Sequence, residues 1–335
     1  MFSRSTGCSI FGIKPKISLN VSHLVKIWIM LTDEQRELLH RDGYVVIPNV
    51  ISENLADATL SEFQGFHAHA TGQQFDPEHY DRALEFKNVH GIIEFPGALS
   101  HTDFVNRVRN DPAVHQVFSE LHDAEPTDPI AMGMDRVNYQ ASTEQRGIVA
   151  RDRKAWWHID QKWSNPELEC FQGYVDIVGS ETDEHGGLMV LAGSHHLFED
   201  LALAYAAGQL SSGWDRDWHR LEIDELDYLT ARGCHPVNVK CPKGGMVIWD
   251  SRTVHMSRPN RHPEDERFVI YTCGFPESWL NAEDFERRKL AVQMRRATSS
   301  WPDARHFFPA KPQWFGTHSE EPQQIAEKWI NQNKQ

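Results

Sequence analysis

Between residues 131 and 273 the chain is a succession of short apolar runs, and this pattern constrains its fold more than any other feature. Gly, Pro, Asp and Asn, which favour turns, separate the runs. The first run, residues 134–140, alternates in polarity as a half-buried strand does. Many short strands of this kind predict an antiparallel barrel or sandwich. The later runs are residues 171–178, 188–192, 246–249 and 267–273.

The residues ahead of these strands predict a helical shoulder. Thr32 and Gln35 have the spacing of a capping box, and Gly43 suits the left-handed end of that first helix. Residues 44–47 form a short β-rich run. Ser52 then begins a second helix, whose apolar residues recur at helical spacing.

The rest of the chain fits around one catalytic core. Residues 199–230 are predicted to be a helical or irregular insertion, and the chain after Pro276 is predicted to be helical to about residue 297. We find no internal repeat and no low-complexity linker that would divide the chain. A single domain over residues 31–335 is therefore expected, with helical shoulder 31–130, barrel core at about 131–276 and C-terminal helical and loop-rich tail 277–335.

The first 30 residues are basic. They include Arg4, Lys14 and Lys16, and no acid precedes Asp33. One interpretation is a targeting segment for mitochondria or another organelle. The other, which we prefer, is a disordered extension or a start codon placed ahead of Met30, with the protein in the cytoplasm.

Composition excludes several classes of protein. The 335 residues carry 34 Lys and Arg against 48 Asp and Glu, a formal charge of -14, which disfavours binding to nucleic acid. No apolar run approaches the roughly 20 residues of a membrane span. The five cysteines are odd in number, without CxxC spacing, which argues against a disulfide framework or a thiolate zinc site. The sequence does not indicate an oligomeric state.

The sharpest chemical feature is the run Trp157-His158-Ile159-Asp160. Residues two apart on a strand project from the same face, so His158 and Asp160 could bind one ion. Alone this pattern is weak, because His-x-Asp arises by chance in many chains.

His255, ninety-five residues after Asp160, strengthens the metal interpretation. A turn at Gly244-Gly245 and an apolar strand lead into it. Two histidines and one carboxylate that leave other positions open are the pattern of non-haem Fe(II) oxygenases. A closed structural zinc site would need a fourth protein ligand.

Arg267 follows His255 by twelve residues and begins another alternating run, which places Arg267, Val269 and Tyr271 on one face. An inward-facing arginine is costly unless it meets an anion, and a guanidinium binds a carboxylate through two hydrogen bonds. Taken alone, Arg267 would more simply be an outward-facing residue paired with a nearby acid. Beside the metal pattern, an inward carboxylate partner is the better interpretation.

Together these motifs resemble the phytanoyl-CoA dioxygenase family. They are His158-Ile-Asp160, the stretch from Gly186-Gly187 through Gly193-Ser194-His195, Asp250 through His255-Met-Ser257-Arg-Pro-Asn260, and Arg267, in that order. The resemblance implies a double-stranded β-helix, that is, a jelly-roll or cupin-like barrel, mainly β with helical additions. It also implies Fe(II), 2-oxoglutarate and dioxygen, a small-molecule substrate, and release of succinate and carbon dioxide.

The family's site residues carry over to five positions here. His158, Asp160 and His255 would be the iron ligands, and Arg267 would bind the far carboxylate of 2-oxoglutarate with help from Ser257. One departure is Ala192, which stands where the family usually has proline.

Other polar residues allow more than one role. Asn138 and Gln140 share a face and could contact 2-oxoglutarate or substrate, but inward polar residues satisfied by their neighbours are equally expected. Arg136, Arg252 and Arg258 are candidate anion contacts, although exposed loop arginines are the simpler expectation for the last two. Ser194 is expected to bond the backbone in a tight turn.

Two tryptophans and two histidines complete the candidates. Trp156 and Trp163 could form an aromatic wall, although a core role is more frequent. His195 and His196 are expected to be loop residues and not ligands.

Three rivals to a hydroxylase were weighed. A non-catalytic barrel used as a ligand-binding or scaffold protein would have little reason to keep all three metal ligands and the arginine. A halogenating relative needs an open position where Asp160 stands. A metal hydrolase would leave Arg267 and Ser257 without a role.

Overall fold

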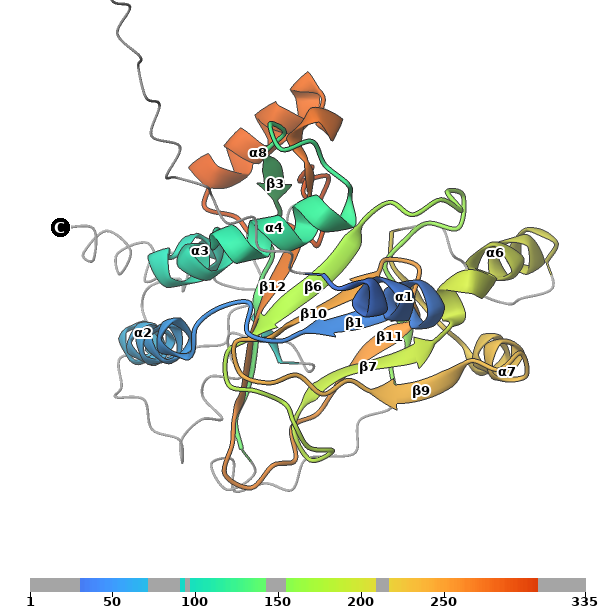
Figure 1. The fold of residues 1–335 in the computed structure, drawn as a ribbon, viewed down its shortest axis with the longest axis horizontal. Helices are drawn as coiled ribbons and strands as arrows, with labels where there is room; N and C mark the ends of the chain where they lie inside the picture. The colour runs from blue at the N-terminus through green and yellow to red at the C-terminus, as the bar shows by residue number, and fades with distance from the viewer. Residues whose placement is uncertain (1–30, 72–90, 94–96, 143–154, 209–216, 307–335) are drawn as a thin grey trace, which may run out of the picture.

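The computed structural model describes residues 31–71, 91–93, 97–142, 155–208 and 217–306. The predicted N-terminal extension 1–30 lies outside them. Two antiparallel sheets form the centre of the described structure, with helices on the outside (Figure 1).

The larger sheet has seven strands in the order β1-β10-β6-β12-β4-β2, and β3 pairs with one end of β12. Its strands are β1 (Tyr44–Ile47), β2 (Ile92–Ile93), β3 (Ile130–Met132), β4 (Val137–Gln140), β6 (Phe171–Asp176), β10 (Met246–Asp250) and β12 (Arg267–Pro276).

The smaller sheet has five strands in the order β8-β5-β11-β7-β9. Its strands are β5 (His158–Ile159), β7 (Gly187–Ala192), β8 (His219–Arg220), β9 (His235–Asn238) and β11 (His255–Arg258).

The expected double-stranded β-helix is confirmed, in the form of two packed antiparallel sheets. Consecutive strands alternate between the sheets from β4 to β7 and again from β9 to β12, so β10 lies in the larger sheet and β11 in the smaller. One detail differs from the sequence expectation. The run 44–47 does not precede the sheet but forms its edge, with Tyr44 opposite Trp249 and Ile47 opposite Met246.

Alternation along the strands separates two cores. On β12, Phe268 and Ile270 pack into the cluster under the helices, whereas Val269 packs between the sheets. On β10, Ile248 faces the helices and Trp249 the space between the sheets. The strands of the larger sheet are therefore buried on both faces, by the helices on one side and by the smaller sheet on the other. The inner face is the one that can carry a site.

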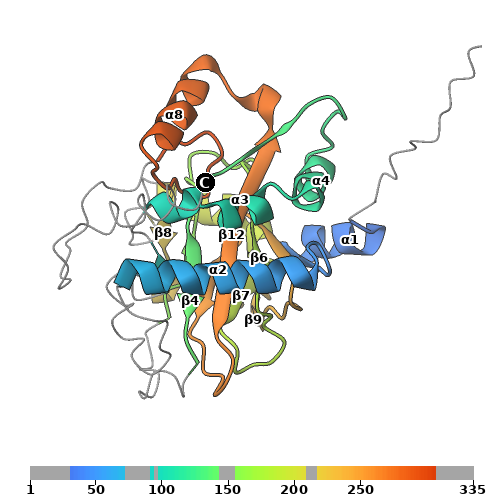
Figure 2. The same ribbon diagram turned by 90° about the vertical axis from the view of Figure 1, so that its left-hand side faces the viewer.

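Three helices cover the outer face of the larger sheet, as Figure 2 shows. They are α2 (Glu53–Thr71), α3 (Asp103–Arg109) and α4 (Pro112–Leu121), with the 3-10 turn η2 (Gly97–His101) before α3.

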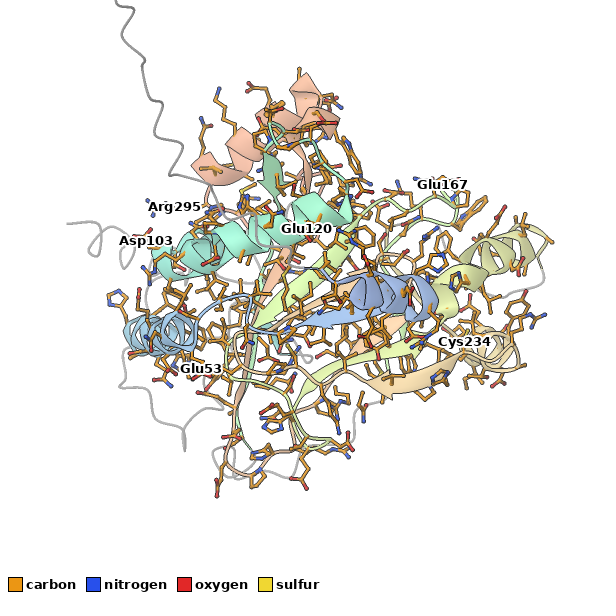
Figure 3. All side chains as sticks on the ribbon, in the orientation of Figure 1. Glu53, Asp103, Glu120, Glu167, Cys234 and Arg295 are labelled. Atoms are coloured by element: carbon orange, nitrogen blue, oxygen red, sulfur yellow. The ribbon has the colours of Figure 1, made fainter. Side chains whose placement is uncertain are left out.

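The first helix, α1 (Asp33–Asp42), begins and ends as predicted. Thr32 and Gln35 form both bonds of the capping box, and Gly43 has φ 80°. Glu120 on α4 lies beside α1 (Figure 3), where its carboxylate accepts the backbone N–H of Leu31. This hydrogen bond holds Leu31, which precedes α1, against the end of α4.

The described parts of the insertion and the tail contain helices, as expected. The 3-10 turn η3 (Ser194–Leu197) precedes the insertion, which holds most of α6 (Phe198–Ala206), β8 and α7 (Ile223–Thr230), and the tail holds η4 (Glu277–Trp279) and α8 (Ala282–Gln293). Residues 209–216 and 307–335 lie outside the described ranges. The four cysteines within them are buried and free of disulfides. No helix in these ranges is long and apolar enough to cross a membrane.

Candidate metal and cosubstrate site

A cavity of about 690 Å³ opens between the two sheets. That volume is typical of small-molecule sites, which run from roughly 300 to 1,000 Å³. The residues singled out in the sequence that line it include His158, Asp160, His255, Ser257 and Arg267. The fold therefore gathers these sequence-predicted residues around one space.

The two histidines come from neighbouring strands of the smaller sheet. His158 on β5 is the register partner of His255 on β11, and their ring centroids lie 4.2 Å apart. Asp160 follows β5 directly. Its Oδ1 lies 3.7 Å from Nε2 of His158, and its Oδ2 lies 3.7 Å from Nε2 of His255. These three side chains could hold one metal ion.

Backbone contacts orient both imidazoles for metal binding. Nδ1 of His158 lies 3.0 Å from the carbonyl oxygen of Trp156, and Nδ1 of His255 lies 2.9 Å from that of Thr253. Because a carbonyl oxygen only accepts, each Nδ1 carries the proton and donates it. Each Nε2 therefore keeps its lone pair toward Asp160, which is the tautomer that a metal requires.

Burial shifts the acid–base balance of the same residues. Loss of hydration raises the pKa of the Asp160 carboxyl, with the Gln172 amide and His255 acting against it, and lowers the pKa of His255. A neutral imidazole is the form that binds metal. A cation between the two groups would hold Asp160 in its charged form.

The Arg267 side chain lines the cavity and has hydrogen-bond donors without partners among the described residues. It is 2% exposed, and its Nε and Nη1 have no hydrogen-bond partner within the described ranges. The hydroxyls of Ser257 and Tyr174 are likewise buried and without a partner there. Buried donors left unmet are costly, so this end of the cavity fits a carboxylate ligand.

Two neighbours shape the space around the guanidinium. The Tyr174 ring lies 5.6 Å from Cζ of Arg267, within range of a cation–π contact. Gly186 leaves room on another side, since a Cβ there would come within 2.9 Å of Cδ of Arg267 and of Cβ of Asn260. The small size of Gly186 is thus required for close packing beside Arg267.

Asn138 lies behind the cavity wall. It is fully buried on β4, and its Nδ2 donates to the hydroxyl of Tyr271, which itself lines the cavity. Its contact with 2-oxoglutarate stays a prediction. Gln140 has a structural role, because it bonds the backbone N–H of Asn260.

The expectation that Arg258 is an exposed loop residue is wrong. It ends β11 and is 8% exposed, with Nη1 donating to the carbonyl of Asp183. The sequence around Arg258 looks like a loop, but in the structure this end of β11 is covered by the turn at residues 181–186, which buries the side chain. Arg252 pairs with Asp250 and is partly buried.

The Gly193-Ser194-His195 segment is structural, as predicted. Gly193 has φ 81°, and the Ser194 hydroxyl accepts the backbone N–H of Val254. His195 contacts the carbonyl of His40, outside the triad.

The two tryptophans proposed as an aromatic wall have different roles. Trp156 lines the cavity and stacks on His158 at 4.3 Å between centroids. Trp163 packs in the cluster of the insertion beside Tyr205.

A second His, His, Asp group lies away from the cavity, at His185, His262 and Asp265. The two imidazoles stack with centroids 4.2 Å apart and planes at 17°. A metal lies in the plane of each imidazole that binds it. The planes of two stacked rings are nearly parallel and do not meet near the rings, so the two imidazoles cannot both bind one ion in this arrangement. Nδ1 of His185 accepts the backbone N–H of Thr182, and its Nε2 donates to Asp265. We interpret this group as a structural contact that links the turn at His185 to the turn at His262 and Asp265.

Several cavity residues were missed by the sequence reasoning. Gln172 and Tyr174 project inward from β6, while Asp217 and Trp218 line the cavity from the insertion and His306 lines it from the tail. Inward polar alternation on β6 was a usable signal for Gln172. The others come from irregular segments, where no periodic pattern marks the buried side.

Comparison with models of protein families identifies the family of this chain. The model of the family described as Phytanoyl-CoA dioxygenase (PhyH) matches residues 39–268, which is more than half of the chain and includes the triad and Arg267. The chain belongs to the phytanoyl-CoA dioxygenase family. The sequence-based prediction of an enzyme of this dioxygenase family is confirmed. The triad and the unpartnered nitrogens of Arg267 fit iron and 2-oxoglutarate.

Two curated proteins are similar to this phytanoyl-CoA dioxygenase family member. "Ava biosynthesis cluster protein O" of Aspergillus versicolor is 22% identical over 272 residues, which cover 77% of this chain and 82% of the relative. A putative phytanoyl-CoA dioxygenase of Dictyostelium discoideum is 22% identical over 293 residues, covering 77% and 79%.

Solved structures are similar to this family member at low identity. EctD from S. alaskensis with bound Fe is 17% identical, with TM-score 0.48, covering 85% of this chain and 83% of that one. The epimerase SnoN, in complex with Fe3+, alpha ketoglutarate and nogalamycin RO, is 16% identical, with TM-score 0.45, covering 72% and 82%.

Proposed function

We propose that this protein hydroxylates a C–H bond of a small molecule. In the balanced reaction, substrate, dioxygen and 2-oxoglutarate yield the hydroxylated substrate, succinate and carbon dioxide. One oxygen atom enters the product and the other enters succinate. The observation that carries the proposal is a cavity that joins a two-histidine, one-carboxylate set to a buried, unpartnered arginine.

In this proposal His158, Asp160 and His255 hold the iron. The backbone carbonyls behind the two imidazoles keep each Nε2 directed at the same point as the Asp160 carboxylate. Three protein ligands leave positions open for a bidentate keto-acid and dioxygen. When bound, iron and 2-oxoglutarate together activate dioxygen for hydroxylation.

Arg267 and Ser257 are proposed to bind the far carboxylate of 2-oxoglutarate, with Asn138 acting through Tyr271. The guanidinium is held away from water and has two nitrogens without partners within the described ranges. The nearby buried carboxylate of Asp176 accepts hydrogen bonds from Gly179 and Ser180. Glu266, the adjacent acid, is turned away and bonds Tyr139 and Gln64 instead.

The remaining wall is proposed to receive the substrate. Trp156, Trp218 and Trp301 line the cavity with aromatic surface, and Asp217 and His306 add a polar pair whose contact atoms lie 2.6 Å apart. Aromatic rings position a ligand through contact area, and a few polar groups fix its orientation. This environment fits a small molecule with an apolar body and some polar groups.

A substrate screen tests the proposal. Purified protein with Fe(II) and 2-oxoglutarate is incubated with compound pools, and succinate release and the gain of one oxygen atom are read by mass spectrometry. A compound that gains one oxygen atom with matching succinate supports the function. Tight 2-oxoglutarate binding without succinate release from any pool would favour the ligand-binding alternative.

A further inference from the structure

The Gln172 side chain joins the proposed metal carboxylate to the rest of the fold. It lies on the inward face of β6, 1% exposed, and lines the cavity. Its Nε2 donates to Oδ2 of Asp160 at 3.1 Å and to Oγ of Ser300 at 2.6 Å, and its Oε1 accepts from Nε1 of Trp249 at 2.7 Å.

The orientation of this amide follows from its neighbours. The indole N–H of Trp249 can only donate, so the Gln172 atom that faces it must be the oxygen. The amide nitrogen is therefore the atom that faces Asp160. Trp249 and Gln172 are register partners on β10 and β6, so the sheet itself fixes their approach. The direction of the hydrogen bond to Asp160 is thus set by backbone pairing.

We propose that Gln172 is a positioning residue that holds Oδ2 of Asp160 and leaves Oδ1 as the metal-binding oxygen. Among the described residues, Gln172 is the one amide or hydroxyl donor recorded on this carboxylate. An oxygen that accepts a hydrogen bond has one lone pair fewer for a metal, which favours metal binding through the other oxygen. That arrangement keeps a coordination position open for the keto-acid or dioxygen, which a bidentate carboxylate would occupy.

Ser300 extends the same network into the tail. It lies in the segment after α8 that supplies Ser299, Trp301 and His306 to the cavity wall. Because Ser300 accepts the second N–H of the Gln172 amide, the position of this segment and the orientation of Asp160 depend on one side chain. We infer that the tail is part of the metal environment as well as of the substrate wall.

Metal affinity tests the role of Gln172, which rests on the proposed metal site. Mn²⁺ is titrated into the apo full-length protein, and the free ion is counted by electron paramagnetic resonance. Loss of an outer hydrogen bond to a metal ligand typically costs about tenfold to a hundredfold in affinity. We expect Gln172→Met to lose that much and Ser300→Ala to lose less, since the amide remains.

Gln161→Met is the matched control. Gln161 is also a buried glutamine. Its hydrogen bonds include donations to the carbonyls of Asn165 and Glu167, and its Oε1 accepts from the Ser251 hydroxyl and from the backbone N–H of Glu169. Its loss should lower the thermal stability of the apo protein and leave Mn²⁺ affinity within about threefold, well below the range typical of outer-ligand contacts.

The outcomes separate the two proposals. Wild-type Mn²⁺ affinity in Gln172→Met, or an equal loss in the Gln161→Met control, overturns the positioning role and leaves the metal site standing. Absence of Mn²⁺ binding by the wild-type protein overturns the proposed metal site itself. A selective loss in Gln172→Met supports the inference.

Discussion

His158 and His255 face each other as a register pair of the smaller sheet, with ring centroids 4.2 Å apart, although they are far apart in the sequence. Each ring is oriented by a carbonyl two residues before it, Trp156 for one and Thr253 for the other. The proposed metal site therefore depends on strand pairing, and its proposed ligands can be tested one at a time.

Replacing either histidine should abolish tight iron binding. We expect His158→Ala and His255→Ala each to lose Fe(II) affinity, because two ligands do not hold the ion as three do. Anaerobic Fe(II) titration of the purified variants measures the loss. His196→Ala, which removes an exposed histidine outside the cavity, is the control. Unchanged iron affinity in both ligand variants would show that the site is elsewhere.

Removing the carboxylate should separate binding from turnover. Asp160→Gly is expected to abolish hydroxylation and yet retain some iron and 2-oxoglutarate binding, because the histidines and Arg267 remain. Succinate release and cosubstrate titration are measured on the same preparation. Full turnover in this variant would contradict the assignment of Asp160 as a ligand.

Arg267 should control 2-oxoglutarate affinity. Stranding one charge of a buried pair costs roughly 3–5 kcal/mol, so Arg267→Ala should weaken binding by on the order of a hundredfold or more. Arg267→Lys should recover only part of this, because a point charge cannot make the two-pronged contact. The visible band of the anaerobic Fe(II) complex follows the titration. An unchanged 2-oxoglutarate titration midpoint in Arg267→Ala would show that Arg267 does not bind the carboxylate, and the buried Arg258 would become the next candidate.

Gly186 should tune the same site through packing. A methyl group at this position would press on Arg267 and Asn260, so Gly186→Ala should weaken 2-oxoglutarate binding by roughly tenfold, equivalent to about 1.4 kcal/mol. The control is the adjacent Gly187→Ala, whose Cβ would meet its nearest atom, Nη2 of Arg258, at 3.5 Å. Equal effects of the two variants would contradict this explanation.

His101 should make the fold sensitive to acid. Burial lowers the pKa of its imidazole to about 4 from 6.5, while its Nε2 donates to the carbonyl of Arg296. The folded state disfavours the extra proton, so stability is complete above pH 6.5 and falls as the pH drops toward 4. At pH 5 the loss from this group is about 2 kcal/mol.

A non-titrating variant isolates that effect. His101→Gln keeps an N–H donor for the Arg296 carbonyl and carries no proton to gain. Urea unfolding at pH 7 and pH 5 should show a smaller loss of stability in the variant than in the wild-type protein. Parallel losses in the two proteins would remove His101 from the acid response.

The local sequence determined much of this protein. Period-two alternation placed Arg267, Val269 and Tyr271 on one face of β12, and capping chemistry placed the start of α1 at Thr32, because both are encoded by neighbouring residues. The His158-x-Asp160 pair was readable for the same reason. A turn and a strand leading into His255 were enough to expect the third member of the set.

Only the tertiary structure decided which distant residues meet. The Gln172 amide reaches Asp160 because β6 pairs with β10 at Trp249, and Ser300 joins them from a tail that has no periodic pattern. Arg258 is buried because another turn covers it. Contacts of this kind depend on sheet register and on the packing of irregular segments, and residues close in the sequence do not encode them.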